Sequence, residues 1–328
     1  MSGTSPKKRF WIKRLQRPFI LLMTMAVLTV LLPDSFLTTE NFINILLAIA
    51  IYGVMVCGSI FPVLLGGIDL SVGSVAALSG AFTVVTTLHL GSSDLGVFLG
   101  CLGGLALGAL IGALHGVVIY RFAVPAFLVT LASLNIVYGF AQIVTDNKVI
   151  SLLSPDSFNF IGGGNLLGVP VPIVLFFIAA VLGWLVLSRT VLGRRTYAVG
   201  GNPTAAALSG VPVLRTTVSA YVLSGVSAAA AGIILASLNQ QAIAKAAQGY
   251  EADVLTAIVV GGTSLMGGEG TVPGAVFGAL LVGILNNGLR LLGVPAIFHG
   301  LVKGVVIIVA VAYDFYARHR GNGKRGKQ

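Results

Sequence analysis

The sequence predicts an all-α integral membrane protein, and three observations lead to that prediction. Of the 328 residues, 56% are hydrophobic and only 9% are charged, whereas a soluble domain carries about 25% charged residues. Mean hydropathy is +0.98, and apolar runs close to the roughly 20 residues that cross a bilayer as a helix recur along the chain. The 43 glycines favour close approach between membrane helices. We therefore expect a Gly-rich bundle of membrane-spanning helices.

About ten apolar segments qualify as spans. The first follows a basic stretch and leads into "LLPDSFLTTEN" rather than into small residues, so we interpret it as a retained span and not as a cleaved signal peptide. The eighth is short for a span. The expected spans are 18–32, 42–65, 69–88, 95–120, 124–145, 169–188, 216–237, 252–266, 271–288 and 297–315.

Basic residues indicate the orientation. They gather in the N-terminal tail 1–17, in the loop 188–216 and in the C-terminal tail 317–328, which the positive-inside rule places in the cytoplasm. An even number of spans puts both termini and that loop on one side. We expect one transmembrane domain over 18–316 between two basic cytoplasmic tails. The net charge of +10 then reflects topology, and no nucleic-acid partner is expected.

Glycine spacing predicts how the helices pack. Within 95–120, glycine recurs every fourth residue from Gly96 to Gly116. Each step of four advances about 40° around a helix, so the stripe winds slowly and admits several neighbours. A weak internal repeat accompanies it, because "LGGIDLSVGSVAAL" (65–78) aligns without gaps to "MGGEGTVPGAVFGA" (266–279). Duplicated halves are common in transporters, often with interrupted helices near the substrate path.

Several classes of function are disfavoured. The chain has no Gly-x-x-x-x-Gly-Lys-Ser/Thr loop for ATP, and we expect no metal site, no cofactor and no catalytic residues. The isolated His115 is interpreted as a satisfied packing residue. Ion-driven carriers need acids at membrane depth, and Asp69 alone lies inside apolar sequence, with Glu251 and Asp253 at the outer end of the eighth span. The chain is therefore either powered by another subunit or a passive pore.

Asp69 allows two interpretations, and both stay open. Gly66 and Gly67 break the backbone before it, so its carboxylate could be the N-cap of the third span and accept the first free amides. The helix dipole would then offset part of its charge, by about 0.3–1 kcal/mol. Alternatively, Asp69 lines the pathway and contacts the substrate.

The cytoplasmic loop contains signals for a short helix. In "NPTAAALSG", Asn202 is suited to the N-cap and Pro203 to the first helical position, and Gly210 supplies a stop. A helix that presents small residues at the membrane surface is suited to docking in a groove of another protein. The alternative is an ordinary connector.

Four stretches resemble the permease subunits of ABC importers for monosaccharides, the ribose/galactose/xylose group. The resemblance covers nearly the whole chain from about Phe42 to Asp314. It implies a homodimer in the bacterial inner membrane, surrounded by lipid, with an ATPase subunit inside and a periplasmic sugar-binding protein outside; the alternative is a stand-alone sugar facilitator or channel. The stretches are "GGIDLSVGS" (66–74), "AVGGNPTAAALSGVPV" (198–213), "GYEADVLTAIVVGGTSLMGGEGT" (249–271) and "GILNNGLRLLGV" (283–294).

The resemblance also implies which residues meet the ATPase. "AAALSG" (205–210) is similar to a degenerate form of the importers' coupling motif, with alanine where the acid would be. That departure leaves open which polar groups make the contact. The residues expected to couple to the ATPase are Arg194, Arg195, Asn202, Ala205, Ala206, Ala207, Ser209 and Gly210.

The fifth span carries groups suited to a sugar. Asn135 and Gln142 lie seven residues apart on one helical face, and amides and aromatic rings suit sugar hydroxyls and ring faces. Ribose-type members often carry arginine where this chain has Tyr138, which weakens a ribose assignment and leaves pentose, hexose and furanose-like substrates open. Glu251 also fits a first-turn helical acid. The expected pathway residues are Asp69, Ser71, Phe127, Asn135, Tyr138, Gln142 and Glu251.

Overall fold

The computed structural model describes residues 21–153 and 155–295, and beyond them 297–298, 300–302, 304–305 and 308. Both predicted tails lie outside the described residues. The all-α class is confirmed, because strands within the described ranges are limited to four two-residue segments. The elements are a helix Leu21–Leu31, then α2 (Thr39–Leu64), α3 (Val72–His89), α4 (Asp94–Arg121), α5 (Ala126–Val144), β1 (Ile150–Ser151), α6 (Asp156–Gly163), β2 (Asn165–Leu166), β3 (Val169–Pro170), α7 (Val171–Arg189), α8 (Val191–Gly201), α9 (Pro203–Leu208), α10 (Val213–Asn239), β4 (Gln241–Ala242), α11 (Tyr250–Val260) and α12 (Val272–Leu291).

Seven described helices are long and apolar enough to cross a membrane. They are α2, α3, α4, α5, α7, α10 and α12, and they coincide with the second to seventh and the ninth expected spans. The first expected span appears in part as the shorter helix Leu21–Leu31. The tenth falls largely outside the described residues. The total of ten spans therefore stays a prediction.

The eighth expected span, 252–266, differs from the structure. Its helix, α11, has 11 residues, about half of what a span needs. The ring of Tyr250, the first residue of α11, packs against Tyr52 near the middle of α2, with centroids 6.4 Å apart. The segment 238–251, expected outside, therefore dips into the bundle. Non-helical backbone is tolerated at that depth where protein buries it.

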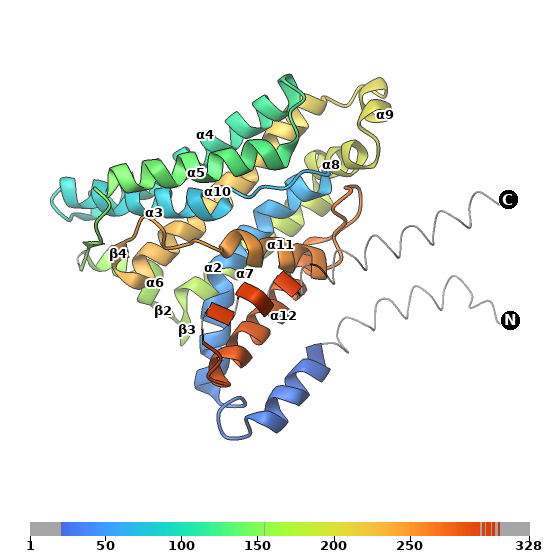
Figure 1. Ribbon diagram of the computed structural model, residues 1–328. Coiled ribbons are helices and arrows are strands. Elements are labelled where there is room, and N and C mark those ends of the chain that lie inside the picture. Colours follow the sequence, from blue (N-terminus) through green and yellow to red (C-terminus); the bar gives the residue numbers. More distant parts are fainter. Residues whose placement is uncertain are drawn as a thin grey trace, which may run out of the picture.

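The helices form two groups that share α10. In one group α3 and α4 pack on α10, and α5 packs on α3. In the other group α7, α11 and α12 pack around α2, and α10 also lies along α2 (Figure 1). Every residue of α2 from 49 to 64 is buried. A helix that is apolar on all sides requires such a central position.

The two ends of the bundle agree with the expected alternation of sides. At one end β1 pairs with β4, Ile150 opposite Ala242, and the Ser157 hydroxyl donates to Asp94 at 2.6 Å. These segments follow the third, fifth and seventh expected spans, so with the N-terminal tail inside they are expected outside. α8 and α9 lie at the opposite end (Figure 1), which the basic residues assign to the cytoplasm.

The glycine stripe of α4 packs as its spacing predicts. A Cβ atom on Gly100 would lie 2.8 Å from the carbonyl oxygen of Thr83 in α3, and one on Gly112 would lie 2.2 Å from that of Tyr221 in α10. The stripe thus faces α3 first and α10 further along. From α10, a Cβ on Gly225 would lie 2.0 Å from the Gly108 carbonyl oxygen, so these two backbones are in direct contact.

Candidate functional site

The loop between α2 and α3 carries Asp69 and is held inside the bundle. Gly66, with φ +80°, adopts a left-handed conformation that favours glycine and ends α2. Two residues further on, the Ile68 carbonyl accepts a hydrogen bond from the Thr130 hydroxyl of α5 at 2.9 Å. Asp69 itself is only 7% exposed.

The Asp69 carboxylate connects this loop to α10. Its Oδ1 accepts from the backbone amide of Ser71 at 3.0 Å and from the Ser71 hydroxyl at 2.6 Å. Its Oδ2 accepts from the Ser224 hydroxyl of α10 at 2.7 Å. The Ser224 Oγ lies 3.2 Å from the Ser59 Oγ of α2; because Ser224 gives its proton to Asp69, Ser59 is the donor here.

The N-cap interpretation of Asp69 is wrong in position. Ser71 is the N-cap residue of α3, and it makes no side-chain cap bond. The carboxylate instead accepts the amide of that residue, within the loop. Asp69 therefore fixes the loop that precedes α3 rather than the first free amides of the helix.

An aromatic pair lies beside this carboxylate. The rings of Tyr221 in α10 and His115 in α4 meet edge to face, with centroids 6.2 Å apart. The His115 Nε2 and the Ser133 hydroxyl are 2.7 Å apart. His115 Nδ1 and the Tyr221 hydroxyl have no hydrogen-bond partner among the described residues. His115 was expected to have its hydrogen bonds satisfied, and the structure satisfies only its Nε2. A Cβ on Gly67 would lie 2.4 Å from the Tyr221 hydroxyl, which places that oxygen against the Asp69 loop.

A second cluster brings two predicted residues together at the start of α3. A Cβ atom on Gly73 would lie 2.5 Å from Glu251 Oε2 and 3.2 Å from the Tyr138 hydroxyl. Glu251 also accepts from the Gly249 amide at 3.1 Å, as a first-turn acid would. The Tyr138 hydroxyl is buried and has no hydrogen-bond partner among the described residues.

The other predicted pathway residues lie apart from both clusters. Phe127 is 49% exposed, Asn135 is exposed and Gln142 is intermediate. The Asn135 side-chain amide donates to the Leu131 carbonyl, one turn earlier, at 3.2 Å. An exposed asparagine on a membrane helix is unusual, because lipid offers it no partner.

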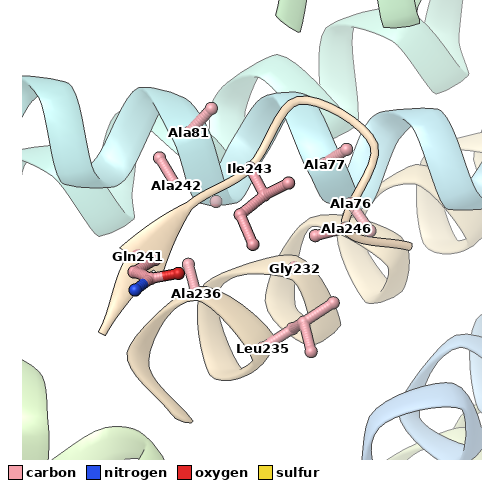
Figure 2. Close-up of a pocket in the computed structure, with 11 residues that line it drawn as sticks. Ala76, Ala77, Ala81, Gly232, Leu235, Ala236, Gln241, Ala242, Ile243 and Ala246 are labelled. Atoms are coloured by element: carbon pink, nitrogen blue, oxygen red, sulfur yellow. The ribbon is translucent and has the colours of Figure 1, made fainter. Parts of the chain in front are cut away.

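The small cavity in Figure 2 is not suited to a sugar. It lies between α3, α10 and the chain around β4, and Gln241 is its only polar side chain. Sugar sites need several convergent polar groups. We therefore interpret it as a gap between small side chains. It is lined by Ala76, Ala77, Gly80, Ala81, Gly232, Leu235, Ala236, Gln241, Ala242, Ile243 and Ala246.

The loop 188–216, which we expect in the cytoplasm, contains the short helix that its sequence predicts. Asn202 is the N-cap of α9 and its Oδ1 accepts from the Ala205 amide at 2.9 Å. Gly210 has φ +81° and follows the helix. Most of the predicted coupling residues are exposed, and Ala206 is buried. The exposed ones are Arg194, Arg195, Asn202, Ala205, Ala207, Ser209 and Gly210.

Two further residues of this segment were not predicted. Leu208 ends α9, and its apolar side chain is 86% exposed. Tyr197 of α8 donates from its hydroxyl to the Gly270 carbonyl at 2.6 Å. Burial raises the pKa of Tyr197, so its hydroxyl remains a protonated donor at neutral pH.

Comparison with known proteins decides the family. Residues 41–311 match a family described as "Branched-chain amino acid transport system / permease component". The chain belongs to this permease family. The permease is 39% identical over 311 residues to a ribose import permease of Haemophilus influenzae, covering 94% of both chains. It is 40% identical over 298 residues to the Bacillus subtilis ribose import permease, covering 90% of this chain and 91% of that one.

An arabinose permease is similar as well. The L-arabinose ABC transporter permease of Azospirillum brasilense is 36% identical over 303 residues, covering 92% of this chain and 87% of that one. No solved structure matches the chain. The resemblance to monosaccharide importer permeases is thus confirmed. The permease is a multi-pass component of a transport system in the bacterial inner membrane, and a stand-alone facilitator is not supported.

Proposed function

We propose that this permease forms the translocation pathway of an ATP-driven importer for a pentose. Two copies would assemble with separate ATPase subunits in the cytoplasm and a sugar-binding protein in the periplasm. The similar permeases named above are those for ribose and L-arabinose, both pentoses. Tyr138 departs from the arginine of ribose-type members, so both sugars are arms of the test.

The exposed α9 is the observation that supports an external ATPase most directly. The chain has no ATP-binding loop of its own, so the energy must enter through a contact. α9 is a defined, capped helix whose last residue, Leu208, is 86% exposed. An exposed leucine that follows three alanines and precedes Ser209 fits an apolar groove, and side chains buried at the centre of an interface contribute most of its affinity.

The proposed pathway uses all seven predicted pathway residues, which lie in three groups. Asp69 and Ser71 shape the loop before α3, and Tyr138 with Glu251 lies at the start of that helix. Phe127, Asn135 and Gln142 lie toward the exposed side of α5, where a second copy would cover them and where the sugar would pass. The exposed apolar side chains of α4 and α7 would face lipid.

Reconstitution tests the proposal. Liposomes that contain the permease and its ATPase are supplied with binding protein loaded with labelled D-ribose or L-arabinose. We expect uptake of one of these sugars that requires ATP on the side of the ATPase. Uptake by the permease alone would support the facilitator, and ATP-dependent uptake of neither sugar would reject the pentose assignment.

Leu208→Asp is expected to weaken the association with the ATPase. Placing a carboxylate in an apolar groove removes an anchor worth about 2 kcal/mol or more, which is roughly a 30-fold loss of affinity. Pull-down of the ATPase with the tagged permease measures it. Leu208→Met keeps the volume and the apolar character, so this control should bind as the wild type does. Equal binding by both variants would contradict the docking role of α9.

Tyr138→Phe is expected to reduce uptake without loss of stability. The Tyr138 hydroxyl makes no hydrogen bond to the described residues, so its removal breaks none of them. A hydrogen bond to the sugar is worth about 0.5–1.5 kcal/mol, hence a roughly three- to tenfold loss of uptake. Tyr52→Phe is the contrasting variant. The Tyr52 hydroxyl donates to the Ala279 carbonyl at 2.8 Å, so removing it breaks a hydrogen bond inside the protein. Unchanged uptake by Tyr138→Phe would remove this residue from the pathway.

A further inference from the structure

Three segments of backbone meet two residues before the N-cap of α9. They are the end of α2, the end of α8 and the loop that precedes α12. The Gly268 amide donates to the Leu64 carbonyl oxygen at 2.8 Å. A Cβ atom on Gly200, the penultimate residue of α8, would lie 1.8 Å from that same oxygen and 2.7 Å from the Gly268 nitrogen. Gly200 therefore rests on the hydrogen bond that joins the other two segments.

The two joined loops are the two copies of the internal repeat. Gly66 and Gly267 are aligned in the repeat, and both have left-handed backbones, with φ +80° and +84°. A Cβ on Gly267 would lie 2.9 Å from the Gly66 nitrogen, and one on Gly66 would lie 3.3 Å from the Met266 carbonyl oxygen. The repeat thus produces two turns that face each other, and α8 ends against both.

One turn leads to the Asp69 loop of the proposed pathway, and the other leads to the start of α12. From Gly66 the chain continues to Asp69, whose carboxylate binds Ser71 and Ser224. The other turn continues through Gly270, whose carbonyl accepts from Tyr197, to Thr271, the N-cap of α12. Gly270 and Asp69 occupy aligned positions of the repeat.

We propose that Gly200 and Tyr197 are positioning residues that transmit movement of α9 to both repeat turns at once. The inference rests on the proposed function and specifies where coupling enters the membrane part. Contact between backbones cannot be absorbed by a change of rotamer, and close-packed interiors transmit strain. Asn202, the N-cap of α9, is only two residues beyond Gly200, so movement of a docked ATPase reaches the Asp69 loop through very few bonds.

A pair of neighbouring glycines gives the test a matched control. Gly200→Ala puts a methyl group into backbone atoms of Leu64 and Gly268, whereas nothing lies within 4 Å of a Cβ on Gly201. In the complex with ATPase and loaded binding protein, we expect Gly200→Ala to bind the ATPase and to hydrolyse ATP. Its uptake per ATP should fall at least tenfold. Gly201→Ala should equal the wild type.

Hydrogen–deuterium exchange reads the transmission directly. Binding of the ATPase should change exchange in 65–71 and 266–271 in the wild type and in Gly201→Ala, but not in Gly200→Ala. If Gly200→Ala is not recovered, Tyr197→Phe decides, because it removes one hydrogen bond and adds no atoms; we expect a several-fold loss of uptake per ATP.

Two results would overturn the proposal. In the first, Gly200→Ala folds and its uptake per ATP equals that of the wild type. If Gly200→Ala is not recovered, the same result for Tyr197→Phe would overturn the proposal. The second is weaker ATPase binding together with unchanged uptake per ATP in the complexes that still form, which would make the junction merely structural. Failure of the importer assignment is separate, since the wild-type complex would then show no ATP-dependent uptake at all.

Discussion

Asp69→Ala is expected to reduce uptake about a hundredfold. The change leaves the Ser71 amide, the Ser71 hydroxyl and the Ser224 hydroxyl without their acceptor. Each buried donor left without a partner costs about 1–3 kcal/mol, so the loop before α3 would not keep its conformation. Uptake of labelled sugar by the reconstituted complex is the measurement. Asp94→Ala is the control, because Asp94 is exposed and accepts from the Ser157 hydroxyl; it should transport normally.

Asp69→Asn separates the structural from the charge-dependent role. The amide oxygen can still accept from Ser71, and the amide nitrogen can donate to the Ser224 Oγ, whose proton then turns to Ser59. The network survives while the charge is lost. Because both carboxylate oxygens are already engaged inside the protein, we expect Asp69→Asn to retain uptake within about threefold. A defect as large as that of Asp69→Ala would show instead that the charge acts on the substrate.

Most helix boundaries could be predicted because two signals in the sequence mark them, the end of an apolar run and a capping residue. The segment 95–120 was expected as a span, and α4 occupies Asp94–Arg121 with Ser93 as its N-cap. There an apolar run ends where a capping residue stands, so hydropathy and local chemistry agree.

α11 could not be predicted by the same argument. Leu265 and Met266 extend the apolar run, but Gly262 and Gly267 have left-handed backbones, and the helix has ended at Val260. A loop buried in protein is as apolar as a helix, so hydropathy does not distinguish them. The glycines in "VVGGTSLMGGEG" were the available signal.

The candidate site could be predicted only where its chemistry is local. Asp69 and Ser71 are two residues apart, and a lone acid in apolar sequence is conspicuous. Ser224 lies 155 positions from Asp69, and a serine in a Gly/Ala-rich helix looks like a packing residue. On α5, helical periodicity grouped Asn135 with Gln142. It could not show that Tyr138 faces α3 while Asn135 is exposed, since that depends on tertiary packing.

Gly225→Ala is expected to destabilise the permease. The added methyl group would lie 2.0 Å from the Gly108 carbonyl oxygen of α4, and backbone cannot rotate away as a side chain can. Overpacking a core costs about 1–3 kcal/mol even where side chains can shift. We therefore expect the purified permease to melt roughly 10 °C lower, or not to be recovered from the membrane.

Gly139→Ala is the matched control, and its comparison with Gly225→Ala tests the glycine packing itself. Both glycines lie in membrane-spanning helices, but nothing lies within 4 Å of a Cβ on Gly139 in α5. Alanine is the better helix former by about 0.8–1 kcal/mol, so this variant should melt at or slightly above the wild-type temperature. Gly108→Ala, whose Cβ would lie 2.3 Å from the Gly225 carbonyl oxygen, should repeat the loss seen for Gly225→Ala. If all three variants melted together, α4 and α10 would not be in backbone contact, and the glycine stripe would need another explanation.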